Sequence, residues 1–470
     1  MPTLTTAKPH AARDEDLNVY LDLTRERRLD SLVTLLRIPS ISGLPAHAAD
    51  CRAAAERLHD DLLAIGMEHV EVAETGGHPV VYADWLHAEG RPTVLVYAHY
   101  DVQPAHASDG WNTEPFEPVI RDGRLIARGA ADDKAQVEMH LRAIEALLAT
   151  RGCLPVNLKL VIEGEEESSS IHLDAWLEAN RERVAADLAV VSDTTFLEGN
   201  IPAVTVSLRG FAGLQIDVAG PTTDLHSGMY GGAVENPANA LCAIIASLKD
   251  SDGRVLVPGF YDDVVELTDD ERAELVATPF DERAYCASLG VLEPAGECGY
   301  GILERIGARP TLDVNGLWSG FEGEGTKTII PAVAHAKISC RLVAKQNPNR
   351  ILEAVSAYIL KVAPPGVGVE IRNHGTAMPM STPLDHPATL AAARAIEATF
   401  HVAPLYVRFG GSVPVAASFE SLLGLPVVLL GFAPPNGNFH APNEWMDLAN
   451  YETGIRTIAR YWDELAEIDL

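Results

Sequence analysis

Short apolar runs alternate with helical segments along the first part of the chain. Runs rich in β-branched residues cover 93–98 (TVLVYA), 156–162 (VNLKLVI) and 186–191 (ADLAVV), and each has the length of a buried strand. After Ala131 the apolar residues return at helical spacing, at Val137, Leu141, Ile144, Leu147 and Leu148. We therefore predict a helix that begins at or near Asp132. The alternation of strands and helices favours an α/β domain with a largely parallel sheet.

The pattern changes near residue 207 and changes back near residue 380. Half-buried strands of a more open sheet are predicted from VSLRGFAGLQIDVAG and AHAKISCRLV, with helices over 237–249 and 348–362. The helical HPATLAAARAIEATF and the strand PVVLLGF then return to the alternation of helices and buried strands seen in the first part of the chain. We predict a principal domain over 1–206 and 381–470, with a mixed, mainly parallel sheet flanked by helices, interrupted by an inserted α+β domain over 207–380.

Composition narrows the class of protein. A chain of 470 residues with 47% hydrophobic residues exceeds the size of one core, which agrees with two domains. The net charge of −30 disfavours nucleic acid and anionic membranes as partners, and no stretch approaches the roughly 20 apolar residues of a membrane span. The start has no apolar signal region, and the six cysteines show no C-x-x-C spacing. We expect a cytoplasmic protein with reduced thiols.

Residues of the types that bind metals concentrate where strands end. The stretches and their side chains are AHYD with His99 and Asp101, ARGAADDK with Asp132 and Asp133, EGEEESSS with Glu163 and Glu165 to Glu167, VSD with Asp193, and NFHAPNEW with His440. Ligands bind in open α/β sheets at the crevice outside the carboxyl ends of the strands. The topology therefore predicts that these side chains converge.

Each stretch taken alone has another interpretation. His99 suits a core histidine held by a neighbouring carboxylate, and Asp132 suits a carboxylate stabilised by a helix N-terminus. The acidic run 163–167 suits a solvated loop, Asp193 a turn or cap residue, and His440 a surface histidine. Solvated surfaces seldom repeat such residues at so many strand ends of one domain. Together, the stretches favour a metal site.

The donor types restrict the metal. Histidine nitrogens with carboxylate oxygens and no cysteine suit zinc, manganese or cobalt, whereas calcium prefers oxygen donors alone. Two histidines and three carboxylates divide between two ions that share one carboxylate as a bridge. Three carboxylates and one bridging hydroxide balance the charge of two divalent ions, and this hydroxide is the nucleophile that a hydrolase needs.

Ordered motifs over roughly 30–465 resemble one enzyme family. The motifs are AHYDVQP, ARGAADDKAQ, EGEEESSS, VVSDT, DLHSGMYGG, GGSVPV and NFHAPNEW. Their order and separations resemble the co-catalytic dimetal (dizinc) metallopeptidases, a family that includes aminoacylases, succinyl-diaminopimelate desuccinylases and carnosinase-type dipeptidases. LHSGMYGG and TIIPAVAHAKISCRLV are most similar to the cytosolic carnosinase-like dipeptidases.

The resemblance implies a metal-dependent amide hydrolase, and a dipeptidase most closely. An N-acyl-amino-acid deacylase or desuccinylase of the same family is the alternative, and a catalytically inactive metal-binding scaffold is a second one. The segments 1–206 and 381–470 would form the catalytic domain, and 207–380 a lid that also forms a homodimer. The substrate would be a small peptide, and the cofactors two divalent ions per subunit, zinc or manganese, with cobalt as a further option.

The resemblance also assigns roles to residues at the strand ends. Its implied metal ligands are His99 and Asp193 on one ion, Glu167 and His440 on the other, and Asp132 as the bridge. Glu166 would be the general base, and Asp101 would accept the second imidazole N–H of His99. The register of the base among the three successive glutamates, Glu165 to Glu167, stays open.

Further residues, most of them in the lid, would contact the substrate. The candidates are His226 as an oxyanion donor, in cis or in trans, Arg341 as a clamp on a substrate carboxylate, Gly410, Gly411 and Ser412 as backbone donors, and Thr328 and His374 on the substrate side. A turn histidine at 226, a structural ion pair at Arg341 and an ordinary turn at 410–412 are the alternatives. The sequence leaves the substrate's side chains and the native metal open.

Overall fold

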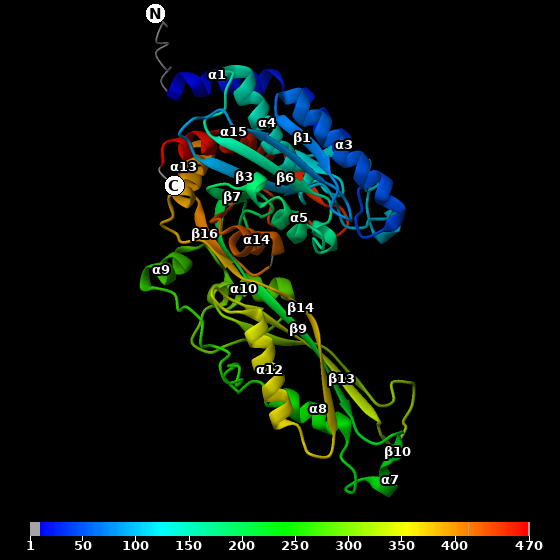
Figure 1. Ribbon diagram of the computed structural model, residues 1–470. Helices are drawn as coiled ribbons and strands as arrows, with labels where there is room; N and C mark the ends of the chain where they lie inside the picture. The colour runs from blue at the N-terminus through cyan, green and yellow to red at the C-terminus, as the bar shows by residue number, and fades with distance from the viewer. Residues whose placement is uncertain (1–9, 412, 469–470) are drawn as a thin grey trace, which may run out of the picture. The chain divides into compact units, whose positions relative to one another are not determined.

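A computed structural model describes residues 10–411 and 413–468. The chain forms two compact units, each described here by itself (Figure 1). Unit 1 comprises Met1–Val206, Thr382–Tyr406 and Ser418–Leu470, and unit 2 comprises Ser207–Ser381 and Val407–Ala417. Residues 407–417, which we placed in the principal domain from the sequence, group with unit 2. No helix among the described residues is long and apolar enough to cross a membrane.

The main sheet has nine strands in the order β1-β2-β6-β3-β7-β17-β8-β15, with β16 paired to β8. The strands are β1 (Glu68–Ala73), β2 (Val80–Trp85), β3 (Thr93–His99), β6 (Asn157–Glu163), β7 (Leu188–Val191), β8 (Ala203–Leu208), β15 (Met380–Ser381), β16 (Leu405–Phe409) and β17 (Val427–Leu429). The four central strands β6, β3, β7 and β17 are parallel, and the pairs β1–β2, β2–β6, β17–β8 and β15–β8 are antiparallel. The predicted mixed α/β class is confirmed.

Helices of unit 1 surround this sheet. They are α1 (His10–Leu23), α2 (Arg25–Leu36), η1 (Pro45–His47), α3 (Ala48–Ile65), η2 (Ala107–Asp109), α4 (Lys134–Arg151), η3 (Glu166–Ser168), α5 (Leu173–Ala179), α6 (Arg181–Val184), α13 (Pro387–Phe400), η4 (Phe419–Leu423) and α15 (Leu448–Ala466). The helix predicted to begin near Asp132 is α4. It is buried on all sides from Lys134 to Leu147, because α1, α2, α3 and α15 pack around it. Charged residues on α4 are paired there, as Arg142 is with Glu138.

The crossover connections bring the ends of three strands to one edge. β3 lies between β6 and β7, so the connections β3–α4–β6 and β6–α5–β7 step across the sheet in opposite directions. Right-handed crossovers then place α4 and α5 on opposite faces. Because β3, β6 and β7 are parallel, their carboxyl ends and the loops that follow lie at the same edge.

A small second sheet in unit 1 joins two distant segments of the chain. It pairs β18 (Trp445–Asp447) with β5 (Arg124–Ile126), and β5 with β4 (Val119–Arg121). Trp445 is the register partner of Ile126. The segment just before β18 therefore lies beside the loop that runs from β5 to α4.

Unit 2 is built on a four-stranded antiparallel sheet. Its order is β11 (Thr311–Ser319), β13 (Val333–Leu342), β9 (Gly210–Ala219) and β14 (Gly368–Ala377). The helices α8 (Pro237–Ala246) and α12 (Pro348–Val362) pack on this sheet and share a second hydrophobic core with it. The remaining elements are β10 (Leu225–His226) paired with β12 (Ile329–Ile330), and α7 (Ser227–Tyr230), α9 (Asp269–Ala277), α10 (Glu282–Leu289), α11 (Ile302–Gly307) and α14 (Pro414–Ser418).

Candidate metal centre

The carboxylate of Asp132 lies between two histidines. Its Oδ1 is 3.1 Å from Nε2 of His99, and its Oδ2 is 3.1 Å from Nε2 of His440. A carboxylate that presents one oxygen to each of two imidazoles has the arrangement expected of a bridging ligand.

Two further carboxylates complete two groups around Asp132. Asp193 Oδ2 lies 4.0 Å from Nε2 of His99, and Glu167 Oε2 lies 3.1 Å from Nε2 of His440. The donor atoms of His99, Asp132 and Asp193 all lie within 4.8 Å of one another, as do those of Asp132, Glu167 and His440. The five side chains predicted as metal ligands therefore come together within unit 1.

Three of these side chains follow or end a strand at the shared edge. His99 is the last residue of β3, Glu167 lies in η3 after β6, and Asp193 follows β7 by two residues. Asp132 precedes α4, and Asp133 occupies the N-cap position of that helix. His440 has a φ of 55° in the loop before β18, and its side chain is 55% exposed, whereas His99 is fully buried.

The electrostatics show a surplus of negative charge. Burial, together with the charge of Asp132, raises the pKa of Asp193 to about 7. Hydrogen bonds to Asp132 and Glu167 raise the pKa of His440 to about 10. Although burial opposes it, hydrogen bonding to Asp101 and Asp132 holds the pKa of His99 well above its usual value. The cluster therefore stabilises positive charge placed among its carboxylates.

The donor set fits a pair of divalent ions. Each group offers one imidazole nitrogen and carboxylate oxygens, with Asp132 common to both. Mixed nitrogen and oxygen donors without sulfur suit zinc, manganese and cobalt, and do not single out one of them. Two positive ions would also relieve the repulsion among the carboxylates.

Asp101 joins two parts of the centre. Nδ1 of His99 lies 3.1 Å from the carbonyl oxygen of Asp101 and 3.4 Å from its Oδ1. Asp101 was predicted to accept this N–H, and its main-chain oxygen is the nearer acceptor. The carboxylate oxygens also accept the backbone N–H groups of Glu166 and Glu167, at 3.2 and 3.0 Å. Asp101 thus fixes both the ring of His99 and the start of η3.

The three successive glutamates point to different partners. Oε2 of Glu165 lies 2.9 Å from Nδ1 of His172, away from the two histidines of the cluster. Glu167 lies against His440, and its Oε2 also accepts the Nε2–H of Gln103 at 2.9 Å. Burial, with the charges of Asp193 and Glu167 adding to it, raises the pKa of Glu166 well above its usual value. The geometry favours the register in which Glu167 is the ligand and Glu166 is the neighbouring free carboxyl group.

Sequence reasoning missed Glu444, a fully buried carboxylate beside the cluster. It accepts hydrogen bonds from Arg128 at 2.8 Å and from the backbone N–H groups of Gly129, Ala131 and Asp132 at 2.9, 2.8 and 3.0 Å. Glu444 therefore ties the loop that carries Asp132 to the segment that carries His440. The signal in the sequence was an acidic residue next to the apolar Trp445 and Met446, four positions after His440.

Asp133, which we set outside the ligand set, accepts the backbone N–H of His99 at 3.3 Å. The peptide bond between Asp132 and Asp133 is cis. Burial raises the pKa of Asp133 well above its usual value. The hydrogen bond from His99 to Asp133 fixes the main chain at the end of β3.

The substrate-side candidates of unit 2 fall into two groups. His226 is exposed on β10, and Thr328 is exposed just before its partner strand β12, where the Ser227 N–H donates to the Thr328 carbonyl at 3.1 Å. Arg341 lies near the end of β13, 5.3 Å from the ring of Phe211. The eight residue steps from Val333 to Arg341 span about 26 Å of strand, so the two groups lie at opposite ends of β13.

The remaining described candidates lie at the same end of the sheet as Arg341, because His374 and Arg209, which contacts Gly410 and Gly411, both lie near Phe211 of β9. His374 is exposed on β14, at a position where the pairing with β9 is irregular. The carbonyl of Gly411 accepts the Arg209 N–H at 3.1 Å, and the carbonyl of Gly410 accepts the Arg209 Nε–H at 3.0 Å. Ser412 lies outside the described residues, so its predicted role stays a prediction.

Comparisons with known proteins agree with the motifs. Residues 95–464 match the model of peptidase family M20/M25/M40. The chain is 33% identical over 454 residues to the Cys-Gly metallodipeptidase DUG1 of Candida albicans, covering 92% of this chain and 93% of the relative. It is 33% identical over 401 residues to the human Beta-Ala-His dipeptidase, covering 83% of this chain and 78% of the relative.

A solved structure of similar fold spans nearly the whole chain. The M20 family metallo-carboxypeptidase Sso-CP2 from Sulfolobus solfataricus has a TM-score of 0.82 and 32% sequence identity, covering 94% of this chain and 99% of that chain.

Proposed function

The chain belongs to the M20/M25/M40 peptidase family and is a metallodipeptidase, and from this premise we propose that it hydrolyses dipeptides at the centre built around Asp132. The observation that carries this proposal is the bridging position of Asp132, whose two oxygens each face a different histidine at 3.1 Å.

In this proposal His99, Asp132 and Asp193 hold one divalent ion. Asp132, Glu167 and His440 hold the other. When bound, such ions supply a water of lowered pKa and polarise the carbonyl of the scissile amide. Zinc and manganese are the ions we propose, with cobalt as a substitute, because the donor set suits all three.

Glu166 acts as the general base and then as the general acid. It accepts a proton from the attacking water as the water oxygen bonds to the carbonyl carbon, and it returns that proton to the leaving nitrogen as the C–N bond breaks. The products are a carboxylic acid and an amine, which ionise to a carboxylate and an ammonium group, and no covalent enzyme intermediate forms. The raised pKa of Glu166 supports this role, because a carboxylate of raised pKa is a stronger base and accepts the proton of the water more readily.

His226 serves as a hydrogen-bond donor to the oxyanion that forms on the carbonyl oxygen. Its Nδ1 accepts the backbone N–H of Gly228 at 3.0 Å, so the neutral ring carries its proton on Nε2. The imidazole is exposed and presents this Nε2–H outward. A fixed donor of this kind stabilises charge that develops in the transition state.

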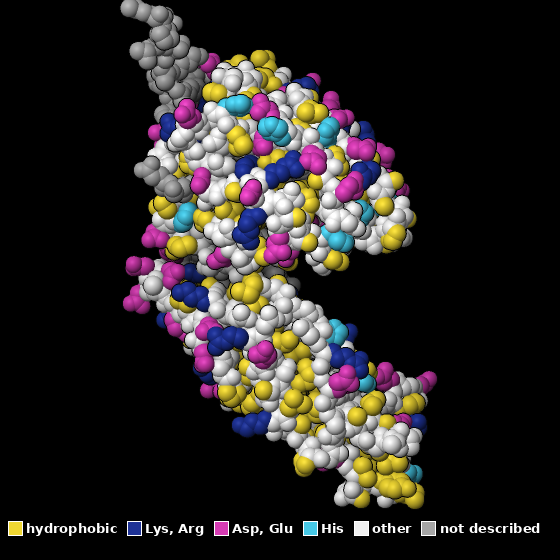
Figure 2. All heavy atoms as spheres, in the orientation of Figure 1, with side chains coloured by type: hydrophobic (Ala, Val, Ile, Leu, Met, Phe, Trp, Pro, Cys, Tyr) yellow, Lys and Arg dark blue, Asp and Glu magenta, His cyan; other side chains and the backbone are white. Residues whose placement is uncertain are grey.

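We further propose that the chain forms a homodimer in which His226 acts on the partner subunit's substrate. A dipeptide is about 7 Å long, so it does not span the roughly 26 Å between the two ends of β13 and cannot contact His226 and Arg341 of one chain. Figure 2 shows hydrophobic side chains gathered at the end of unit 2, where Met229 of α7 is 72% exposed. An exposed apolar patch beside a functional side chain supports an interface between subunits.

Arg341 clamps the substrate's terminal carboxylate. A guanidinium binds a carboxylate through two parallel hydrogen bonds, which selects dipeptides over blocked amides. The relatives named for Cys-Gly and Beta-Ala-His substrates both act on dipeptides with a free carboxylate, and we extend that substrate class to this chain. A cytoplasmic location completes the proposal, and the six unpaired cysteines agree with a reducing compartment.

The test compares a dipeptide panel with an N-acyl-amino-acid panel. Purified protein is assayed before chelation, after chelation, and after Zn²⁺, Mn²⁺ or Co²⁺ is returned. We expect chelation to abolish hydrolysis of dipeptides, including Cys-Gly and β-Ala-His, and a returned ion to restore it. Preference for the N-acyl panel would replace the dipeptidase assignment with a deacylase, and inactivity with every ion would favour a binding scaffold.

A further inference from the structure

A β-bulge in the edge strand β1 places two adjacent polar side chains on one side of the strand. Glu68 pairs with Asp84 of β2, and the next pair is Glu71 with Tyr82, so β1 contains one more residue than β2 between these pairs. His69 lies in the bulge with a φ of 47°. Neighbouring residues of a regular strand point to opposite faces, whereas here Glu68 and His69 both reach Asp84.

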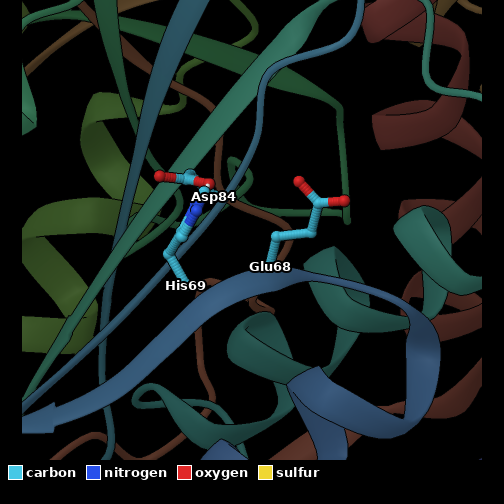
Figure 3. A group of neighbouring side chains, drawn as sticks. All are labelled: Glu68, His69 and Asp84. Atoms are coloured by element: carbon cyan, nitrogen blue, oxygen red, sulfur yellow. Dashed lines mark hydrogen bonds and ion pairs between the residues drawn. The ribbon is translucent and has the colours of Figure 1, made fainter.

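These three side chains form a compact group of donor atoms (Figure 3). Nδ1 of His69 lies 2.7 Å from Oδ1 of Asp84. One donor atom from each of Glu68, His69 and Asp84 lies within 4.8 Å of the other two. In Figure 3 the ring of His69 is directed at the carboxylate of Asp84, and Glu68 extends beside them from the neighbouring position.

Neighbouring residues hold the two carboxylates in place. Asp84 is only 6% exposed, and its Oδ2 accepts the hydroxyl of Tyr82 at 3.0 Å. Nε2 of His87 lies 3.0 and 2.9 Å from the two oxygens of Glu68. The ring of His87 packs edge-on against Trp85, with 5.0 Å between ring centroids. A built setting of this kind distinguishes the group from scattered surface charges.

Two carboxylates and one imidazole meet in this group. It lies beside Lys159, the partner of Asp84 on β6, and Arg183, which donates to the His69 carbonyl at 3.5 Å. Glu68 and Asp84 are direct partners across two antiparallel strands, where like charges repel. A left-handed backbone is unfavourable for a residue with a side chain, and at His69 it directs an imidazole toward these carboxylates. The side chain of His69 is 71% exposed, so an ion has access from solvent.

We propose that Glu68, His69 and Asp84 bind a divalent transition-metal ion such as Zn²⁺, with His87 holding Glu68 in its binding orientation. An imidazole nitrogen with carboxylate oxygens suits zinc, cobalt or nickel, whereas magnesium and calcium favour oxygen donors alone. The group shares no residue with the centre at Asp132. Binding ties β1 to β2 at the edge of the main sheet and stabilises that edge without taking part in the hydrolysis.

The test measures bound zinc per chain in the full-length protein. Chelator-stripped protein is dialysed against buffered Zn²⁺, and the bound zinc is quantified by mass spectrometry together with the dipeptidase activity. We expect His69→Gly to bind one equivalent less than the wild type and to keep its kcat. Glycine removes the imidazole and tolerates the positive φ, so folding is preserved.

Glu68→Gln is the second variant and should also lose one equivalent. His59→Ala is the matched control, because His59 is also paired with an aspartate, Asp60, at 3.0 Å but has no third donor. It should bind as much zinc as the wild type. Equal zinc in His69→Gly, Glu68→Gln and the wild type would overturn the proposal. Failure of the catalytic assignment would instead appear as absent activity, so the two proposals fail separately.

Discussion

The metal-ligand cluster of unit 1 and the substrate-side candidates of unit 2 are built in opposite ways. The cluster gathers five side chains from distant parts of the sequence within a few ångströms, because three parallel strands end at one edge. The candidates of unit 2 are spread along a long antiparallel sheet. The exposed His226 lies near the start of β13 and the half-buried Arg341 lies near its end, and the strand between Val333 and Arg341 spans about 26 Å.

This difference separates two tasks. Chemistry at a metal centre needs ligands held in advance, and Asp101 and Glu444 supply that support through backbone hydrogen bonds. Recognition of a small peptide can instead be assembled from pieces that meet when a second subunit is present. The comparison predicts that changes at the cluster act on kcat and metal content within one subunit, whereas changes in unit 2 act on substrate binding or, at His226, on kcat across the dimer.

The largest effect should come from Glu166→Gln. The amide keeps the size of the side chain but cannot accept the proton of the attacking water, so kcat should fall by roughly 10²–10⁴-fold. The bound metal should stay as in the wild type, because Glu166 is not one of the ligand groups. Steady-state kinetics with metal analysis checks this, and loss of metal would move the base to another glutamate.

Replacing His226 by alanine should reduce kcat by roughly 10²–10³-fold, the usual effect of removing one oxyanion donor. Mixing this variant with Asp132→Asn should restore about a quarter of the wild-type activity in a two-fold symmetric dimer, because half of the dimers then carry one competent site. Assays of each variant alone and of the mixture after subunit exchange test the arrangement. No restoration despite exchange would mean that His226 acts within its own subunit, or not at all.

Glu444→Gln should weaken metal binding by roughly 10- to 100-fold, the range found for residues that orient ligands. The neutral amide leaves Arg128 buried without its ion-pair partner and turns an N–H donor toward backbone N–H groups, which lowers the free energy of unfolding by roughly 3–5 kcal/mol. Metal titration and thermal unfolding measure both effects. Glu89→Gln at an exposed position is the control and should change neither.

The sequence predicted most of the cluster because its ligands obey a topological rule. Apolar runs of strand length identified β3, β6 and β7, and polar residues at their ends had to share one edge. The role of Glu444 was not predicted, because its partners are backbone N–H groups of a distant loop and only the pairing of β18 with β5 brings them together. The bulge at His69 was not predicted for a similar reason, since it depends on the register of two strands.

The positions of the substrate-side residues in unit 2 could not be predicted in the same way. Period and composition identified β9, β13, α8 and α12. They give no information on how far two residues of one sheet lie from each other, and so on whether both can contact one substrate. His226 and Arg341 were both assigned to substrate from the resemblance, and only the register of β13 shows that they lie at its two ends.

The smallest effect should come from Arg341→Lys, and it sharpens the comparison most. Lysine keeps the positive charge but lacks the planar fork that pairs with a carboxylate, so the loss of one charged hydrogen bond raises KM about tenfold. kcat should stay nearly unchanged, because the terminal carboxylate is bound equally in the ground state and the transition state. Arg372→Lys on β14, where Arg372 pairs with Asp217 and Glu370, is the control and should leave KM unaltered. If Arg341→Lys lowered kcat or the melting temperature at unchanged KM, Arg341 would serve the packing around Phe211, and the recognition of the carboxylate would have to come from elsewhere in the chain.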